Sequence, residues 1–71
     1  MEEIFIKDDF IRLDSALKFC GAVQTGGQAK IEIISGEVLV NDEVCTMRGK
    51  KLHNGDKVKF NNKEYVIKNE C

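Results

Sequence analysis

The sequence predicts a single small domain of the α+β class, with two strands, two short helices and then four short strands along the chain. Three observations lead to this order. The 71 residues leave room for one domain only, covering residues 1–71. Apolar residues recur at helical spacing in two stretches of the first half. Short apolar segments separated by Asn-containing turns fill the second half, which is typical of strands joined as hairpins.

The chain is expected to open with a hairpin. Residues 4–7 and 10–12 flank Asp8-Asp9, and both Asp residues tolerate the backbone of a two-residue turn. In this register Ile6 lies opposite Ile11.

Two helices follow. The first is predicted from about Asp14 to Cys20, ending at Gly21, because four apolar residues share one face: Leu13, Ala16, Leu17 and Cys20. The second is predicted to begin at Thr25, whose hydroxyl can cap the first turn, and to run to about Ile34. Gly36 suits a left-handed end to this helix. Its expected core residues are Ala29, Ile33 and Ile34.

The remaining strands form two predicted hairpins. Residues 37–40 and 43–46 flank Asn41-Asp42, which places Leu39 opposite Val44. Residues 47–52 form a polar, cationic connection. Residues 57–60 and 64–68 flank Asn61-Asn62, which places Val58 opposite Tyr65 and Lys59 opposite Glu64.

Several classes of protein are excluded. No uninterrupted apolar run exceeds three residues, so no membrane span is expected. Met1-Glu2-Glu3 is acidic where a signal peptide is basic, which favours a cytoplasmic protein. The three cysteines form no Cys-x-x-Cys pair, so neither a disulfide framework, a metal site nor a cofactor is expected. Cys20 and Cys45 are expected to be buried, and Cys71 to lie at a frayed terminus.

The charge is unevenly distributed. The net charge of −1 contains a segment, residues 47–59, with five basic residues and one acidic residue, or +4. Residues 1–14 and 37–46 each carry −3. The basic residues of the +4 segment are Arg48, Lys50, Lys51, Lys57 and Lys59. Such a loop can bind phosphates, or it can be a solvated surface.

A second candidate site lies at the start of the second helix. Thr25-Gly26-Gly27 places free backbone amides at the positive end of a helix dipole, which suits an anion as well as a plain helix cap. Lys18 and Lys30 can border the same surface.

These segments together resemble a known family. The ordered motifs are Arg12-Leu13-Asp14-x-x-Leu17, Thr25-Gly26-Gly27-Gln28-Ala29-Lys30-x-x-Ile33-Ile34, Gly36-x-Val38-x-Val40-Asn41 and Lys51-Leu52-x-x-Gly55-Asp56-x-Val58. They are similar to the RNA-binding domain named after the fourth protein of the small ribosomal subunit, with its αL motif. The resemblance covers about residues 11–60. The Gly-Gly-x-Ala-Lys stretch and the small size resemble the free-standing bacterial YbcJ/YaaA-like branch.

The resemblance implies two short helices packed on a small, strongly bent, mainly antiparallel sheet. It also implies a non-catalytic protein that binds structured RNA, such as ribosomal RNA or a ribosome-assembly intermediate. We expect the protein to be a monomer. Carried over by position, the RNA-facing residues are Arg12, Thr25, Gln28 and Lys30 on the helices, Asn41 on the turn, and Arg48, Lys50 and Lys51 on the loop. Many family members have Ser-Arg where this chain has Thr25-Gly26. This difference moves the expected contact to the backbone amides of Gly26 and Gly27.

Two other classes of function compete with RNA binding. The acidic segments suit a protein-interaction or regulatory module with a basic protein partner and no RNA. An enzyme would require a pair between His53, the single histidine, and Cys20 or Cys45. A ubiquitin-like sulfur carrier is disfavoured, because such carriers end in Gly-Gly and this chain ends in Asn69-Glu70-Cys71.

Overall fold

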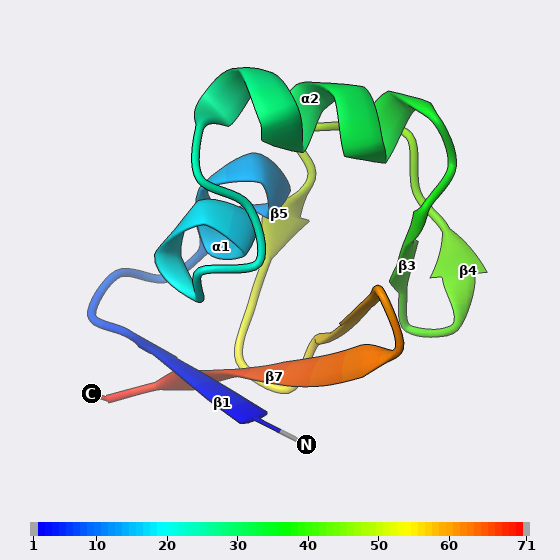
Figure 1. The fold of residues 1–71 in the computed structure, drawn as a ribbon. Coiled ribbons are helices and arrows are strands. Elements are labelled where there is room, and N and C mark those ends of the chain that lie inside the picture. Colours follow the sequence, from blue (N-terminus) through cyan, green and yellow to red (C-terminus); the bar gives the residue numbers. More distant parts are fainter. Residues whose placement is uncertain (1, 71) are drawn as a thin grey trace.

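The computed structural model describes residues 2–70 and confirms the α+β class (Figure 1). It has one strand more than the sequence predicted, because two residues of the expected cationic connection pair as a strand. The elements are β1 (Glu2–Ile6), β2 (Ile11–Arg12), α1 (Leu13–Phe19), α2 (Gly26–Ile34), β3 (Val38–Val40), β4 (Glu43–Val44), β5 (Lys51–Leu52), β6 (Lys57–Phe60) and β7 (Lys63–Asn69).

The larger sheet has the strand order β1-β7-β6-β3-β4, and β2 with β5 forms a separate small sheet. Every neighbouring pair in the larger sheet is antiparallel except β1 with β7. Figure 1 shows β3 and β4 running steeply while β7 lies almost across them, so the strand direction turns sharply along the sheet. The sheet is therefore mainly antiparallel, as the resemblance implied.

Both predicted hairpins of the second half are confirmed. Leu39 pairs with Val44 across the first turn, and Val58 pairs with Tyr65 and Lys59 with Glu64 across the second. All four turn residues have positive φ, between 52° and 69°, which Asn and Asp tolerate better than other side chains do. These residues are Asn41, Asp42, Asn61 and Asn62.

The predicted hairpin at the start of the chain is wrong. Ile6 lies beside Asn69 of β7, and Ile11 pairs with Leu52 of β5. The side-chain amide of Asn69 also donates to the backbone carbonyl of Asp8 at 2.9 Å, which ties the connecting segment to β7. Parallel pairing with β7 buries the side chains of Ile4 and Ile6 in the common core. Burial in this core outweighs the local turn preference of Asp8-Asp9.

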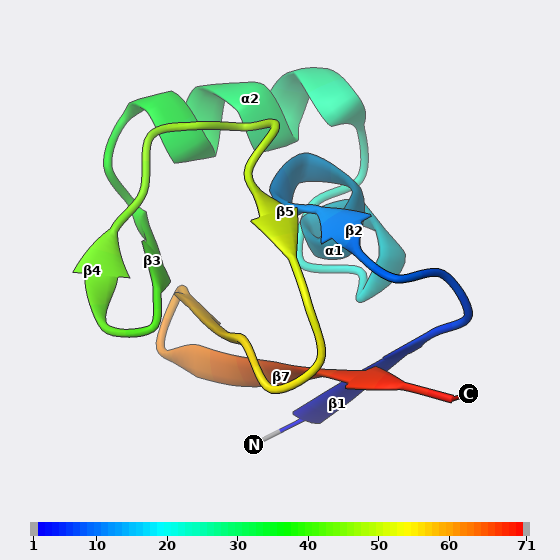
Figure 2. The ribbon, with the colours of Figure 1, turned by 180° about the vertical axis from the view of Figure 1, so that it is seen from behind.

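Both helices lie on one side of the larger sheet, as the two opposite views show (Figures 1 and 2). Their inward faces share one core with the strands. The core residues are Ile4, Ile6, Leu13, Ala16, Leu17, Val23, Ala29, Ile33, Val38, Val40, Leu52, Val58, Phe60, Tyr65 and Ile67. Neither helix in residues 2–70 is long and apolar enough to cross a membrane.

Three predicted core positions need correction. Ile34 is 55% exposed, because the helix turns by about 100° per residue and its neighbour Ile33 takes the inward position. Cys20 and Cys45 are half-buried and not buried, since both lie just beyond an element's end at the margin of the core. Cys71 lies outside the described residues.

Candidate nucleic-acid interface

The cationic loop, residues 45–50 between β4 and β5, is attached by its backbone to the start of α1. The amide of Leu13 donates to the carbonyl of Lys50 at 2.8 Å, and the amide of Asp14 donates to the carbonyl of Arg48 at 3.1 Å. The first amides of a helix have no partner within the helix, so the loop satisfies two of them. The amide of Lys50 also donates to the carbonyl of Met47, which closes a turn inside the loop.

Arg12 joins the same corner of the molecule. Its guanidinium lies against Gly49, where a Cβ atom would be 3.7 Å from Nη2 of Arg12. Nη2 also pairs with Asp14 at 3.2 Å, and this pair is exposed. Lys51 lies opposite Arg12 in the register of β2 and β5, with its Nζ 4.9 Å from the centre of the Phe10 ring. The structure therefore brings the predicted cations of the loop and Arg12 together.

The predicted cap at the start of α2 is confirmed. The hydroxyl oxygen of Thr25 accepts a hydrogen bond from the amide of Gln28 at 3.1 Å. In return, the side-chain oxygen of Gln28 accepts a hydrogen bond at 3.1 Å from the amide of Gln24, the residue before the cap. The amides of Gly26 and Gly27 have no partner among residues 2–70, and both residues are exposed. Two free donors thus remain at the positive end of the helix.

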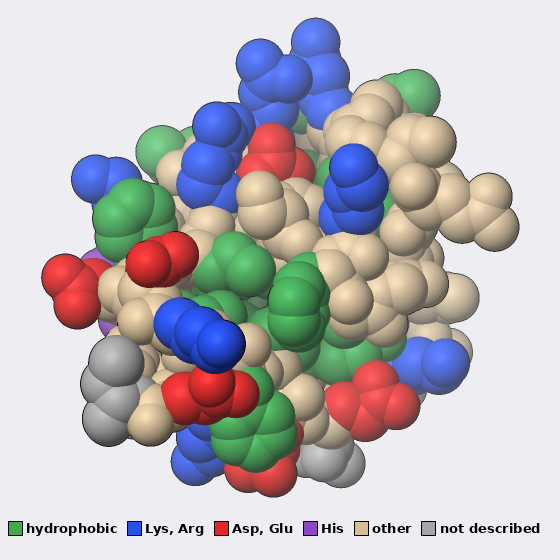
Figure 3. Space-filling model, turned by 90° about the vertical axis from the view of Figure 1, so that its left-hand side faces the viewer, with side chains coloured by type: hydrophobic (Ala, Val, Ile, Leu, Met, Phe, Trp, Pro, Cys, Tyr) green, Lys and Arg blue, Asp and Glu red, His purple; other side chains and the backbone are tan. Residues whose placement is uncertain are grey.

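The remaining predicted cations are exposed. Lys18 lies in the last turn of α1 and Lys30 on α2. No ion pair within residues 2–70 involves Lys18, Lys30, Arg48 or Lys50. Both ribbon views place α2 and the cationic loop at the top of the molecule, and Figure 3 shows Lys and Arg side chains gathered there above a hydrophobic centre. These charges are available to an anionic partner.

The side chain of Asn41, another predicted contact, is engaged through both its oxygen and its nitrogen. Its oxygen accepts from the amide of Lys57 at 3.0 Å, and its nitrogen donates to Asp56 at 3.2 Å. The amide of Asn41 donates to the carbonyl of Lys57 at 2.8 Å. These bonds join the β3–β4 turn to the start of β6.

His53 has no cysteine partner within residues 2–70. Its ring lies near Phe10, with 6.2 Å between centroids, and its Nδ1 is 3.8 Å from a carboxylate oxygen of Asp56. The thiol of Cys20 donates to the carbonyl of Leu17 and that of Cys45 to the carbonyl of Met47. The described residues also contain no group of three His, Cys, Asp or Glu side chains placed to hold a metal ion.

The cations were predicted from the sequence, but the hydrogen bonds that attach the cationic loop to α1 were not. The anchoring atoms are backbone amides and carbonyls, which every residue type provides, so no sequence signal marks them. The pairing of Lys51 and Leu52 as a strand was missed for a related reason, since its partner β2 was assigned to another hairpin.

Together these features define a small α+β domain in which one end carries free cations and free helix amides. The chain belongs to the S4 domain family, whose model matches residues 4–68. This confirms the family that the motifs resembled, and the match extends beyond residues 11–60 into the strands β1 and β7.

Two relatives extend this result. The chain is 45% identical over 57 residues to the probable ribosome maturation protein RlbA of Bacillus subtilis (strain 168), with 80% of each chain covered. It is also similar to the solution structure of YbcJ from E. coli, described as revealing an αL motif involved in RNA binding. The TM-score is 0.73 at 30% identity, over 96% of this chain and 87% of that chain.

Proposed function

We propose that this protein binds structured RNA, without catalysing a reaction, and acts in ribosome maturation. The contacts come from a surface that we call the RNA face, and Asn41 contributes by holding the adjacent turn. The RNA face consists of Arg12, Lys18, Thr25, Gly26, Gly27, Gln28, Lys30, Arg48, Lys50 and Lys51. The RNA-binding description of YbcJ and the ribosome maturation name of the B. subtilis relative support this function.

One observation carries the proposal. The two hydrogen bonds from the start of α1 to the loop carbonyls hold Arg48 and Lys50 in place beside Arg12. A cation on a fixed backbone loses less conformational entropy on binding than a cation on a free loop. Fixed cations spaced along one surface recognise the shape of a folded RNA through its phosphates.

Charge reversal tests the RNA face. The double variant Lys50→Glu with Lys51→Glu should bind purified bacterial ribosomal RNA at least about tenfold more weakly in a filter-binding assay, because it replaces phosphate contacts by repulsion. The matched control is Lys59→Glu with Lys63→Glu, which makes the same change in net charge on exposed positions of β6 and β7. Equal losses in both variants would show that net charge alone, and not this face, determines binding.

Co-purification distinguishes RNA binding from a protein-interaction module. The tagged protein should sediment with ribosomal particles in a sucrose gradient, and nuclease treatment should release it. Partners that remain bound after nuclease treatment, with no RNA recovered, would favour the protein-interaction function.

A further inference from the structure

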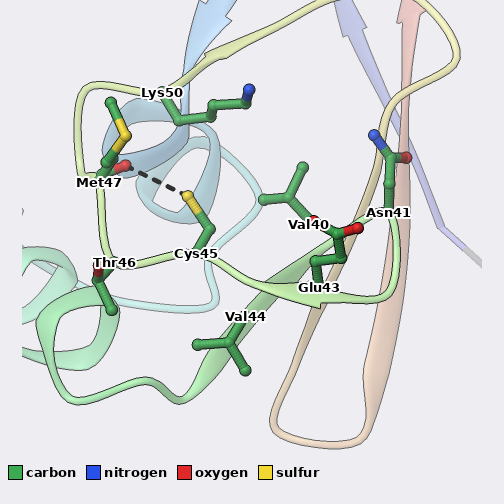
Figure 4. A pocket seen from close by; sticks show the side chains of 8 residues that line it. All are labelled: Val40, Asn41, Glu43, Val44, Cys45, Thr46, Met47 and Lys50. Carbon is green, nitrogen blue, oxygen red and sulfur yellow. Dashed lines mark hydrogen bonds between the residues drawn. The ribbon is translucent and has the colours of Figure 1, made fainter.

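A hollow beside the cationic loop suggests which part of an RNA the RNA face binds. It has a volume of about 440 Å³ and lies between the β3–β4 turn and the loop (Figure 4). Val40, Val44, Cys45 and Met47 supply apolar walls, while Glu43 and Lys50 supply charged groups. A single nucleobase fits within this volume.

Two of the apolar side chains that line the hollow are largely exposed to solvent. Val44 is 60% exposed and Met47 65% exposed, although both side chains are hydrophobic. Met47 directly precedes Arg48 in the chain, and Val44 lines the same hollow as Lys50. Apolar surface next to such cations suits the face of an unpaired base, since single-stranded RNA presents its bases splayed out beside its backbone.

Glu43 is the residue on this surface that RNA binding alone does not explain. Its carboxylate forms no ion pair within residues 2–70, and it repels phosphates. In Figure 4, Lys50 extends along the hollow toward the end where Glu43 and Asn41 lie. The Asn41 side chain is already bonded to Lys57 and Asp56. Glu43 and Lys50 are therefore the charged acceptor and the charged donor among the side chains that line the hollow, and Thr46 adds a hydroxyl group.

A carboxylate and an ammonium group select among the bases. Guanine presents two adjacent N–H donors, at N1 and N2, and acceptors at O6 and N7 on the neighbouring edge. Uracil presents one N–H donor, and adenine and cytosine present one amino group each. We propose that the hollow binds the base of an unpaired guanosine, with Glu43 accepting from N1–H and N2–H and Lys50 donating to O6. This inference rests on the proposed RNA-binding function.

Short labelled oligonucleotides test the guanine preference by fluorescence anisotropy at low salt. A uridine hexanucleotide with one central guanosine should bind roughly tenfold more tightly than the all-uridine hexanucleotide, and one with central inosine, which lacks the N2 amino group, should bind in between. Glu43→Gln should remove the preference without weakening the all-uridine binding. Glu37→Gln, at an exposed acid outside the hollow, should keep the preference.

The thiol of Cys45 reports on the hollow directly. The guanosine oligonucleotide should slow the alkylation of Cys45 by iodoacetamide, measured by mass spectrometry of its peptide, and leave Cys20 unaffected. Cys20 is the matched control because it is also half-buried but lies away from the hollow.

The outcomes separate the two proposals. If ribosomal RNA binds and Lys50→Glu with Lys51→Glu weakens it, but guanosine gives no preference or Glu43→Gln retains one, the guanine site is overturned alone. If neither ribosomal RNA nor any oligonucleotide binds, the RNA-binding function and the guanine site are both overturned.

Discussion

Among single residues, Asn41 shows how one side chain can hold a turn that the RNA face depends on. It combines a positive φ of 52° with two side-chain hydrogen bonds to the start of β6. Asn41→Ala should lower the free energy of unfolding by about 1–3 kcal/mol, because it loses these bonds and strains the left-handed backbone. Urea denaturation followed by circular dichroism measures this change.

Asn41→Gly is the control for the backbone contribution. Glycine adopts positive φ freely, so the difference between the Gly and Ala variants reports the strain, and the remaining loss reports the hydrogen bonds. Wild-type stability in both variants would contradict the structural role of Asn41.

Tyr65 gives the protein a predicted sensitivity to alkaline pH. Burial, the nearby Cys20 and Glu2 raise the pKa of Tyr65 above its ordinary value of 10.0. The unfolded chain therefore loses the phenolic proton at a lower pH than the folded protein does. The contribution of Tyr65 to the free energy of unfolding should be fully present below pH 10.0 and should fall as the pH rises above that value.

Urea denaturation between pH 8 and pH 11 follows this loss, and the Tyr65→Phe variant isolates the contribution of Tyr65. The variant differs from the wild type only in the Tyr65 hydroxyl, so its stability should decline less steeply than that of the wild type. Parallel declines would mean that Tyr65 does not contribute.

Among the helices and strands, the sequence predicted correctly those features that depend on residues close together in the chain. The Asn-Asp and Asn-Asn turns, the Thr25 cap and the apolar stripe of α1 each depend on neighbours in the sequence, and each prediction was confirmed. The placement of β1 and β2 depends on partners about 40 to 60 residues away, and it was predicted wrongly. The same limit applies to the interface, where charge was visible in the sequence but the attachment of the loop to α1 was not.

The start of α2 allows the contribution of a backbone amide to be measured. Gly26 is the first residue of the helix, where proline is tolerated, and nothing lies within 4 Å of a Cβ built there. Thr25 before it is extended, with φ −134° and ψ 159°, as a residue preceding proline prefers. Gly26→Pro should therefore fold normally and remove one amide donor.

We expect Gly26→Pro to weaken binding of ribosomal RNA by roughly tenfold, the value of one hydrogen bond to a charged group. Gly26→Ala retains the amide and should bind as the wild type does in the same filter-binding assay. Equal binding by the two variants would show that this amide does not contact RNA.

For the whole molecule, a net charge of −1 means that RNA is attracted to one face and not to the protein as a whole. Contact with roughly three to five phosphates should give a slope of about −2 to −4 when the logarithm of affinity is plotted against the logarithm of salt concentration. Filter binding with ribosomal RNA across a salt series measures the slope. An affinity independent of salt would contradict binding through phosphates.

The pairing of β1 with β7 also determines when the protein can fold. The first strand has no sheet partner until the last strand has been synthesised, because Ile4 lies beside Ile67. Closing so long a loop costs entropy that shorter contacts do not, and contacts of this range slow folding. A nascent chain that stops before β7 contains every residue of the RNA face but cannot complete the sheet that supports it.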